Sequence, residues 1–389
     1  MNDTPGADWD PRSHRVQSDQ RAAYDSMRET CPVAWSDYMQ WSLFRHADVT
    51  RAVLDHATFS NVVSNRLTVP NGMDPPEHTA WRPIVEKYFT KGRVDAFEPV
   101  CRGIAAALIV AAAGPVELMG AIAHPFAVRV QCAFLGWPDE LAEPLRRWVA
   151  RNHEATLARD HGAMTRIAGE FQALIQGTIA ARIAAGATPE TDVAVALTQE
   201  TIHGRRLSED EVTSILRNWT VGEIGTIAAS VGILAEYLAS DGGLQGRLRA
   251  DPSLAGPAAD EILRLHGPLV TNRRVTTCPV EIGGRRLPAG ARVTVNWVAA
   301  NRDPRVFDDP DVFRLDRDPC HNLLYGAGIH VCPGAELARM ELRVVLEELL
   351  ARTSAIAPDH PATPAAYPAS GFRTLHLLIS PKRNGVRTN

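Results

Sequence analysis

Residues 325–334 read YGAGIHVCPG and run directly into an apolar-periodic stretch, AELARMELRVVLEELL. Because glycine permits backbone conformations and close approaches that a side chain would forbid, the pattern predicts a tight loop that delivers the thiol of Cys332 to the N-terminus of a helix. The unpaired N–H groups and the positive dipole end of a helix favour a thiolate over a thiol. N–H groups aimed at sulfur also tune a metal–sulfur bond.

Two other interpretations of Cys332 are an ordinary buried cysteine and a zinc ligand. Zinc needs several Cys or His ligands, and only His330 lies at a suitable spacing from Cys332. The loop therefore favours a metal site with a single thiolate. The remaining cysteines show no pairing rhythm, and without an export signal we expect reduced packing residues of a cytoplasmic protein: Cys31, Cys101, Cys132, Cys278 and Cys320.

The chain has 389 residues and no linker-like or repetitive segment, so we expect a single domain over residues 1–389. A chain of this length can enclose a flat cofactor together with a substrate. The net charge of −4 argues against nucleic acid as a partner. The N-terminus is polar, and the longest apolar stretch, residues 104–118, is too short to span a bilayer. We therefore expect no membrane association and a flexible tail over residues 1–15.

The hydrophobic periodicity predicts a mainly helical chain with a smaller β-rich part. Apolar residues recur at helical spacing from Pro76 to about Ala239, and Ser208 with Glu211 forms a capping box ahead of a long helix that ends near Leu238. Short strands, short helices and tight turns occupy the rest. The predicted elements outside the helical stretch are a strand pair at 39–44, a helix at 47–55, strands at 280–282, 285–287 and 288–295, a helix at 334–351 and a closing strand pair.

The cysteine loop resembles the heme-binding loop of the cytochrome P450 family, and the resemblance extends over residues 35–378 in the expected order. It implies the mainly α P450 fold with a b-type heme held between two helices. It also implies that Cys332 is the axial ligand, since a thiolate pushes electron density to iron and favours O–O cleavage. His330 falls on a heme-propionate position, and Tyr325 replaces the usual Phe beneath the ring. The family glycines of the loop are Gly326, Gly328 and Gly334.

Further motifs of the family are present. Glu261 and Arg264 match its E-x-x-R pair, which in the family is buried and joined by a later arginine, here Arg317. The segment DPPEH at 74–78 resembles the family segment that opens a helix. The resemblance implies that His78 and Arg82 bind the heme propionates together with His330. Arg273 is expected to complete this clamp, with its neighbour Arg274 as the rival.

The long helix departs from the family pattern. The family usually carries an acid and an alcohol side by side after a glycine and one further residue, and this pair relays protons. If Gly222 is the family glycine, Ile224 and Gly225 stand at the places of the acid and the alcohol. If Thr226 is the family alcohol, Gly225 stands at the place of the acid, so either register breaks the adjacent pair. Our hypothesis is that Glu223 and Thr226 form a displaced relay pair. The alternative is that Glu223 meets a substrate group or an arginine while ordered water carries the protons.

By resemblance, the reaction is the insertion of one oxygen atom from O2 into an organic molecule. The chain has no flavin or iron–sulfur motif of its own, so electrons are expected from a separate ferredoxin with its ferredoxin reductase, docking near Lys91, Arg93 and Arg339. Because the relay pair is broken, a hydrogen-peroxide-driven peroxygenase is an alternative. A heme-binding sensor without turnover is an alternative from another class.

The residues expected to line the substrate pocket are mostly apolar, so we expect a small apolar or aromatic substrate. The segment between Ser60 and Asp74 is shorter than the family usually places over the pocket. Arg66 in this segment is expected to point to solvent. The predicted pocket residues are Val62, Val63, Leu67, Val69, Trp219, Gly222, Leu269, Val270 and the turn near Ala369.

Overall fold

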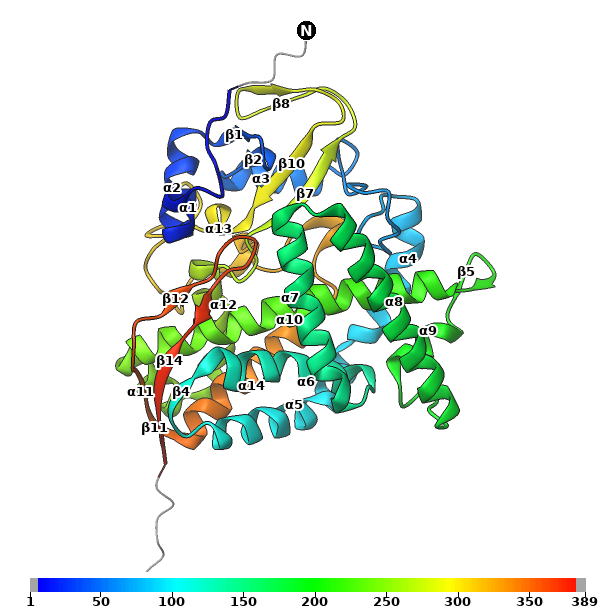
Figure 1. The fold of residues 1–389 in the computed structure, drawn as a ribbon. Helices are drawn as coiled ribbons and strands as arrows, with labels where there is room; N and C mark the ends of the chain where they lie inside the picture. The colour runs from blue at the N-terminus through cyan, green and yellow to red at the C-terminus, as the bar shows by residue number, and fades with distance from the viewer. Residues whose placement is uncertain (1–5, 383–389) are drawn as a thin grey trace, which may run out of the picture.

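The computed structural model describes residues 6–382. A large helical body occupies one part of the molecule, and strands β1, β2, β7 and β10 gather at the top of Figure 1. The helices are α1 (His14–Ser18), α2 (Gln20–Thr30), α3 (His46–Leu54), α4 (Glu77–Glu86), α5 (Lys91–Ala111), α6 (His124–Leu135), α7 (Ala142–Ala158), α8 (His161–Ala184), α9 (Val193–Gln199), α10 (Glu209–Ser240), α11 (Gly242–Ala250), α12 (Ala255–His266), α13 (Trp297–Ala300) and α14 (Ala335–Arg352).

The longest helix, α10, begins at the predicted capping box. The hydroxyl of Ser208 accepts from the Glu211 N–H at 3.3 Å, and the Ser208 N–H donates to the Glu211 carboxylate at 2.7 Å, so two otherwise unpaired donors are satisfied. The helix packs against α6, α7, α8, α12 and α14 in the middle of the molecule (Figure 1). By length and composition α10 resembles a membrane span, but 61% of its most apolar window is buried inside the protein.

The main sheet has the strand order β1-β2-β10-β7-β3. Strand β10 pairs in parallel with β2 and antiparallel with β7, where Val293 lies opposite Arg274 and Thr294 opposite Arg273. Successive residues of a strand point to opposite faces, so the two arginines lie on different sides of the sheet. The strands of this sheet are β1 (Val33–Ser36), β2 (Gln40–Leu43), β3 (Phe59–Ser60), β7 (Thr271–Thr276) and β10 (Arg292–Asn296).

The remaining strands form small antiparallel pairs and one three-stranded sheet, β11-β14-β4. The predicted strands at 280–282 and 285–287 are present as β8 and β9, but the strand predicted from residue 288 starts only at Arg292, because residues before it form a turn. These strands are β4 (Gly114–Glu117), β5 (Thr201–Ile202), β6 (Arg205–Arg206), β8 (Val280–Ile282), β9 (Arg285–Leu287), β11 (Thr353–Pro358), β12 (Thr363–Pro364), β13 (Phe372–Thr374) and β14 (His376–Pro381).

The predicted N-terminal tail needs correction in its described part. Residues 1–5 lie outside the described residues. Trp9, however, is buried, and its ring makes edge contacts with Tyr24 at 6.3 Å and with Phe44 at 5.1 Å. Asp8 pairs with Arg285 at 3.0 Å. An apolar ring and an ion pair therefore attach this part of the chain to the β-rich side.

Candidate active site around Cys332

The cysteine loop is built on two left-handed glycines, Gly326 with φ +75° and Gly328 with φ +72°. A Cβ added at Gly328 would lie 2.7 Å from the backbone oxygen of Val53, so this position needs glycine both for its backbone conformation and for the close approach of α3. The loop closes where the N–H of Cys332 donates to the carbonyl of Tyr325 at 2.8 Å. The thiol therefore has a fixed position just before α14.

The thiol of Cys332 is accessible but partly desolvated by the protein around it. Burial raises the pKa of Cys332, while the Gly334 N–H and the charge of Arg82 lower it. The backbone N–H at the start of α14 thus favours the thiolate, while burial opposes it. A cation bound at sulfur reverses this balance, because a coordinating thiol is deprotonated.

Two histidines from distant segments lie together beside the loop. The rings of His78 on α4 and His330 in the loop are 4.3 Å apart at their centroids, and the Nε2 atom of each is buried without a hydrogen-bond partner among residues 6–382. Burial lowers the pKa of both rings, that of His330 to about 3. The charge of Arg82 acts in the same direction on both rings, and that of Arg274 does so on His330. Each ring therefore has a nitrogen free to hydrogen-bond a bound group.

Arg274, and not Arg273, completes this cluster. Arg274 is buried, and its charge acts on His330. Arg273 lies on the other face of the sheet, where its charge acts on Tyr38. The expectation for Arg273 is therefore corrected, and the cause is the strand alternation described above. Burial lowers the pKa of Arg274 to about 10, since this guanidinium bonds only to the carbonyl of Arg273 among the described residues.

The cluster fits the carboxylates of a heme. His78 and His330 each have a buried ring nitrogen without a partner among the described residues, and the buried Arg274 bonds only to the Arg273 carbonyl. Buried polar groups are rarely left so. Arg82 extends toward the same loop, where its Nη2 donates to the Val331 carbonyl at 2.6 Å, and its Nε bonds to Glu86 at 2.7 Å. Two propionates placed here would accept hydrogen bonds from these groups. Without such partners, the burial of the groups costs free energy.

The structure brings together the buried network predicted from the E-x-x-R motif. Glu261 accepts from Arg264 at 2.8 Å and 3.0 Å and from Arg317 at 2.9 Å. Arg264 also donates to the carbonyls of Asn301 at 2.7 Å and Pro310 at 2.9 Å. The network joins α12 to the loop that precedes the cysteine, so it holds the approach to Cys332 in place.

On α10, the side chains of Glu223 and Thr226 do not bond to each other. The Thr226 hydroxyl donates to the backbone carbonyls of Gly222 and Glu223. Gly222 is exposed although its helix runs through the protein, and a Cβ added to it would meet nothing within 4 Å. This face of α10 therefore borders an open space.

The carboxyl group of Glu223 lies near a second carboxyl group, that of Glu341 on α14. Both groups are buried, and Glu223 Oε1 and both oxygens of Glu341 lack hydrogen-bond partners among residues 6–382. Burial raises the pKa of Glu223 to about 8, and burial together with Glu223 raises the pKa of Glu341 well above its ordinary value. The pair therefore holds at least one proton at neutral pH.

The predicted pocket residues divide into two groups. Val62 and Leu269 are partly exposed, at 53% and 40%, and Val63, Arg66 and Leu67 also reach the surface. In contrast, Val69 is fully buried, Val270 lies in the N-terminal core, and Trp219 packs against Tyr88 and Phe89 at 5.8 Å and 5.1 Å. These last three are buried, which an enclosed pocket would also require, so their place in the pocket stays a prediction.

The short segment before α4 is fastened to α10. The Ser214 hydroxyl accepts from the Val69 N–H at 3.0 Å and donates to the Leu67 carbonyl at 3.0 Å. Arg217 donates to Leu67 at 2.6 Å, and Asn218 donates to the Val69 carbonyl at 2.8 Å. Each bond uses a backbone group, so the attachment does not depend on the side chains of the segment.

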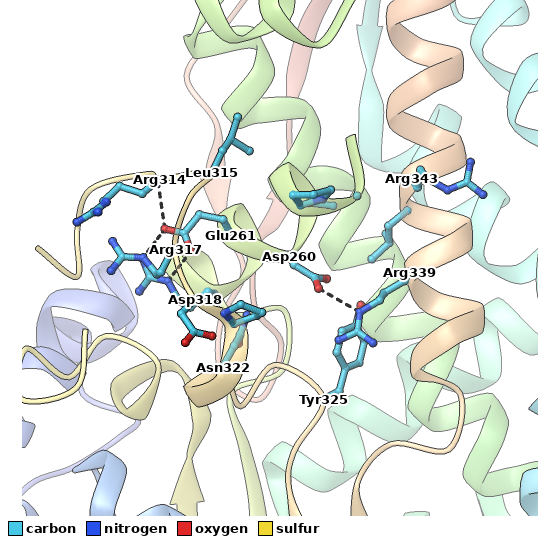
Figure 2. A pocket seen from close by; sticks show the side chains of 16 residues that line it. Asp260, Glu261, Arg314, Leu315, Arg317, Asp318, Asn322, Tyr325, Arg339 and Arg343 are labelled. Carbon is cyan, nitrogen blue, oxygen red and sulfur yellow. Dashed lines mark hydrogen bonds and ion pairs between the residues drawn. The ribbon is translucent and has the colours of Figure 1, made fainter. Parts of the chain in front are cut away.

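A pocket of about 460 Å³ lies on the Cys332 side of the molecule, between α12, α14 and the loop that carries Tyr325 (Figure 2). Arg339 bonds to Asp260 there at 3.0 Å and lies over the Tyr325 ring at 4.4 Å. The Tyr325 hydroxyl has no hydrogen-bond partner among the described residues. This pocket is separate from the open face of α10 at Gly222.

Sequence reasoning missed His153 on α7. Its ring contacts α10 at Gly225, the residue at the family's alcohol place. No sequence motif surrounds His153. The only signal in the sequence was Gly225, whose missing side chain leaves room for a ring from another helix.

Comparison with known proteins identifies the family. A family model described as Cytochrome P450 matches residues 257–377. The chain is 33% identical to the cyclomarin C epoxidase CymV of Salinispora arenicola over 335 residues, which cover 81% of this chain and 84% of that protein. It is 31% identical to the erythromycin C-12 hydroxylase of Saccharopolyspora erythraea, with 86% of this chain and 87% of that protein covered.

Comparison with solved structures also identifies cytochrome P450 enzymes. A mutant of P450 EryK in complex with erythromycin B is similar with a TM-score of 0.85 and 28% identity, covering 94% of this chain and 99% of that chain. Cytochrome P450 CYP109Q5 from Chondromyces apiculatus has a TM-score of 0.84 and 28% identity, covering 97% and 99%. The predicted fold is thereby confirmed. This chain belongs to the cytochrome P450 family, as a bacterial monooxygenase that uses heme with a cysteine thiolate as axial ligand.

Proposed function

We propose that the enzyme inserts one oxygen atom from O2 into a small, mostly apolar organic molecule in the cytoplasm, with Cys332 as the thiolate ligand of heme b. The observation that carries this assignment is the pair of buried, unpartnered ring nitrogens of His78 and His330, with the buried Arg274 next to them, beside an accessible cysteine. Bound heme supplies the activation of oxygen, and the protein supplies position and protons.

Each residue has a defined task in this proposal. His78, Arg82, Arg274 and His330 hold the heme carboxylates. Gly222 leaves the face of α10 open, so that the reacting groups can approach the helix closely. Glu223 stays protonated at neutral pH because it is buried, with its carboxyl near Glu341 on α14. Thr226 and Glu223 remain the proposed proton-handling residues, acting separately, since the hydroxyl of Thr226 is bonded to backbone carbonyls.

We further propose that electrons arrive from a ferredoxin-type partner on the Cys332 side. Arg339 is half-exposed there, although Asp260 and Glu336 already pair with it at 3.0 Å and 3.2 Å. Lys91 is 81% exposed and pairs with Asp95, and Arg93 lies over the Tyr88 ring. An acidic partner would compete with these weak surface pairs.

The first experiment is an optical titration of the purified ferric protein with a varied small-molecule library. A heme-thiolate spectrum that shifts with one chemical group supports the assignment and identifies the substrate class. The matched control is Cys332→His, which should keep heme and lose the thiolate spectrum, whereas Cys320→Ser, on the surface, should change nothing. A protein that binds no heme contradicts the proposal.

A second candidate is turnover driven by hydrogen peroxide. It is favoured by Ile224 and Gly225, which stand where the family places its acid and alcohol. The test compares product formation with peroxide and with a ferredoxin, its reductase and NADPH. Faster turnover with peroxide would establish the second candidate in place of the first.

A further inference from the structure

Two glycines on one face of α10 have different surroundings. A Cβ added at Gly222 would meet nothing within 4 Å, whereas a Cβ added at Gly225 would lie 3.3 Å from Cε1 and 3.8 Å from Nε2 of His153. Residues three and four apart share a helix face, so Gly222, Gly225 and Thr226 are neighbours there. The imidazole therefore lies against the helix about one turn from the open space at Gly222.

The helix that carries His153 is held firmly in place. The Trp148 indole donates to the Ile167 carbonyl at 2.8 Å, and Arg151 pairs with Glu170 at 2.6 Å. The turn between α7 and α8 is short, and Asp160 caps α8. The position of the ring on α10 is thus set by two helices and does not depend on a long loop.

The ring of His153 has unused hydrogen-bonding capacity. Neither of its nitrogens bonds to any residue within 6–382, and no carboxylate pairs with it. Burial lowers the pKa of His153, so the imidazole is neutral at pH 7 and offers one donor and one acceptor. The family's acid and alcohol would be the polar side chains of this helix face, and here Ile224 and Gly225 supply none.

We propose that His153 is a specificity-determining residue, which hydrogen-bonds a hydroxyl or carbonyl oxygen of the substrate, and that residue 225 is glycine to admit its ring. This inference rests on the proposed oxygenation and extends it. The substrate class becomes a mostly apolar molecule with one hydrogen-bonding oxygen. A site built to bond such a group discriminates against analogues without it, because its own polar atoms are then left unpaired.

The test is an optical titration of the heme-loaded enzyme with two matched pairs of probes, 4-cyclohexylphenol against cyclohexylbenzene and 2-naphthol against naphthalene. We expect the wild type to bind the hydroxyl compound about three- to tenfold more tightly, as one net hydrogen bond implies. In His153→Phe the ratio should fall to about one. The control Glu154→Gln, an exposed neighbour, should keep the wild-type ratio.

Equal affinity for both members of each pair in the wild type would overturn the proposal, as would an unchanged ratio in His153→Phe. A protein with a heme-thiolate spectrum that binds none of the four probes also counts against this substrate class. A missing heme-thiolate spectrum, in contrast, contradicts the proposed function.

A double-mutant cycle tests the contact itself without any turnover. Gly225→Ala is measured in the wild type and in His153→Ala by thermal unfolding. Alanine favours a helix over glycine, but the new methyl group would press on the ring, so the substitution should raise Tm more in the His153→Ala background. Equal changes in Tm in both backgrounds would show that the ring does not lie against the helix, and the proposal would fail.

Discussion

The carboxyl groups of Glu223 on α10 and Glu341 on α14 lie in one buried interface where, within residues 6–382, neither has a basic partner. The arginines of the neighbouring helix faces are already paired, since Arg102 and Arg343 both bond to Glu98 and Glu347. Glu223 also raises the pKa values of Cys101 on α5, Cys132 on α6 and Cys332, in each case together with the larger effect of burial. The carboxyl groups of Glu223 and Glu341 are therefore uncharged only when both are protonated.

Stability should fall as the pH rises from about 4.5 to 8. In the unfolded chain Glu223 ionises near its ordinary pKa of 4.5, whereas in the folded chain its pKa is about 8, so the unfolded state is favoured progressively across this window. Glu223→Gln should flatten the dependence and raise Tm at pH 8. The measurement is Tm against pH, with the exposed Glu336→Gln as control, and an unchanged slope in Glu223→Gln would contradict the account.

Arg274 should matter for heme retention and Arg273 should not. Arg274→Leu removes a buried guanidinium of the proposed carboxylate clamp, so we expect heme to transfer to apomyoglobin at least about tenfold faster, as the loss of one charge-assisted hydrogen bond implies. Arg273→Leu, one residue away on the opposite face of β7, is the matched control. Equal rates of heme transfer for the two variants would show that Arg274 does not hold a heme carboxylate.

Gly328→Ala should disrupt the cysteine loop, whereas Gly334→Ala should be tolerated. The first position has φ +72° and leaves 2.7 Å between a new Cβ and the Val53 carbonyl, but the second has a negative φ and only ring atoms of Phe89 at 3.5 Å. We expect Gly328→Ala to cost about 1–3 kcal/mol or more. Urea unfolding of both variants measures the difference, and equal stabilities would refute the steric argument.

Glu261→Gln should destabilise the fold strongly. It leaves the buried guanidinium of Arg264 without its counter-charge, which in comparable cases costs about 3–5 kcal/mol. The surface pair of Arg151 and Glu170 serves as control, since Glu170→Gln should cost less than about 1 kcal/mol. Both are read by urea unfolding, and a small effect of Glu261→Gln would mean that the network contributes little to stability.

The parts of the site predicted from sequence are those fixed by short-range geometry. The glycines around Cys332 and the three-residue spacing of Glu261 and Arg264 determine local structure within a turn, so their contacts follow from the residues alone. The mainly helical fold followed in the same way from the periodicity of the apolar residues.

The errors arose where a shift of one residue along a strand or a helix decides which way a side chain points. Arg273 and Arg274 exchange faces with a shift of one residue in strand pairing. On α10 each residue turns the helix by about 100°, so Glu223 points away from Gly222 and toward α14. His153 comes from a distant helix, and no local pattern signals such a contact.

The attachment of residues 67 and 69 to α10 has a kinetic consequence. This segment stays closed against α10, because opening it would break the hydrogen bonds of its backbone to Ser214, Arg217 and Asn218 at the same time. Because these bonds use backbone groups of the segment, we expect the entry rate of substrate to be indifferent to the side chains at 62–69.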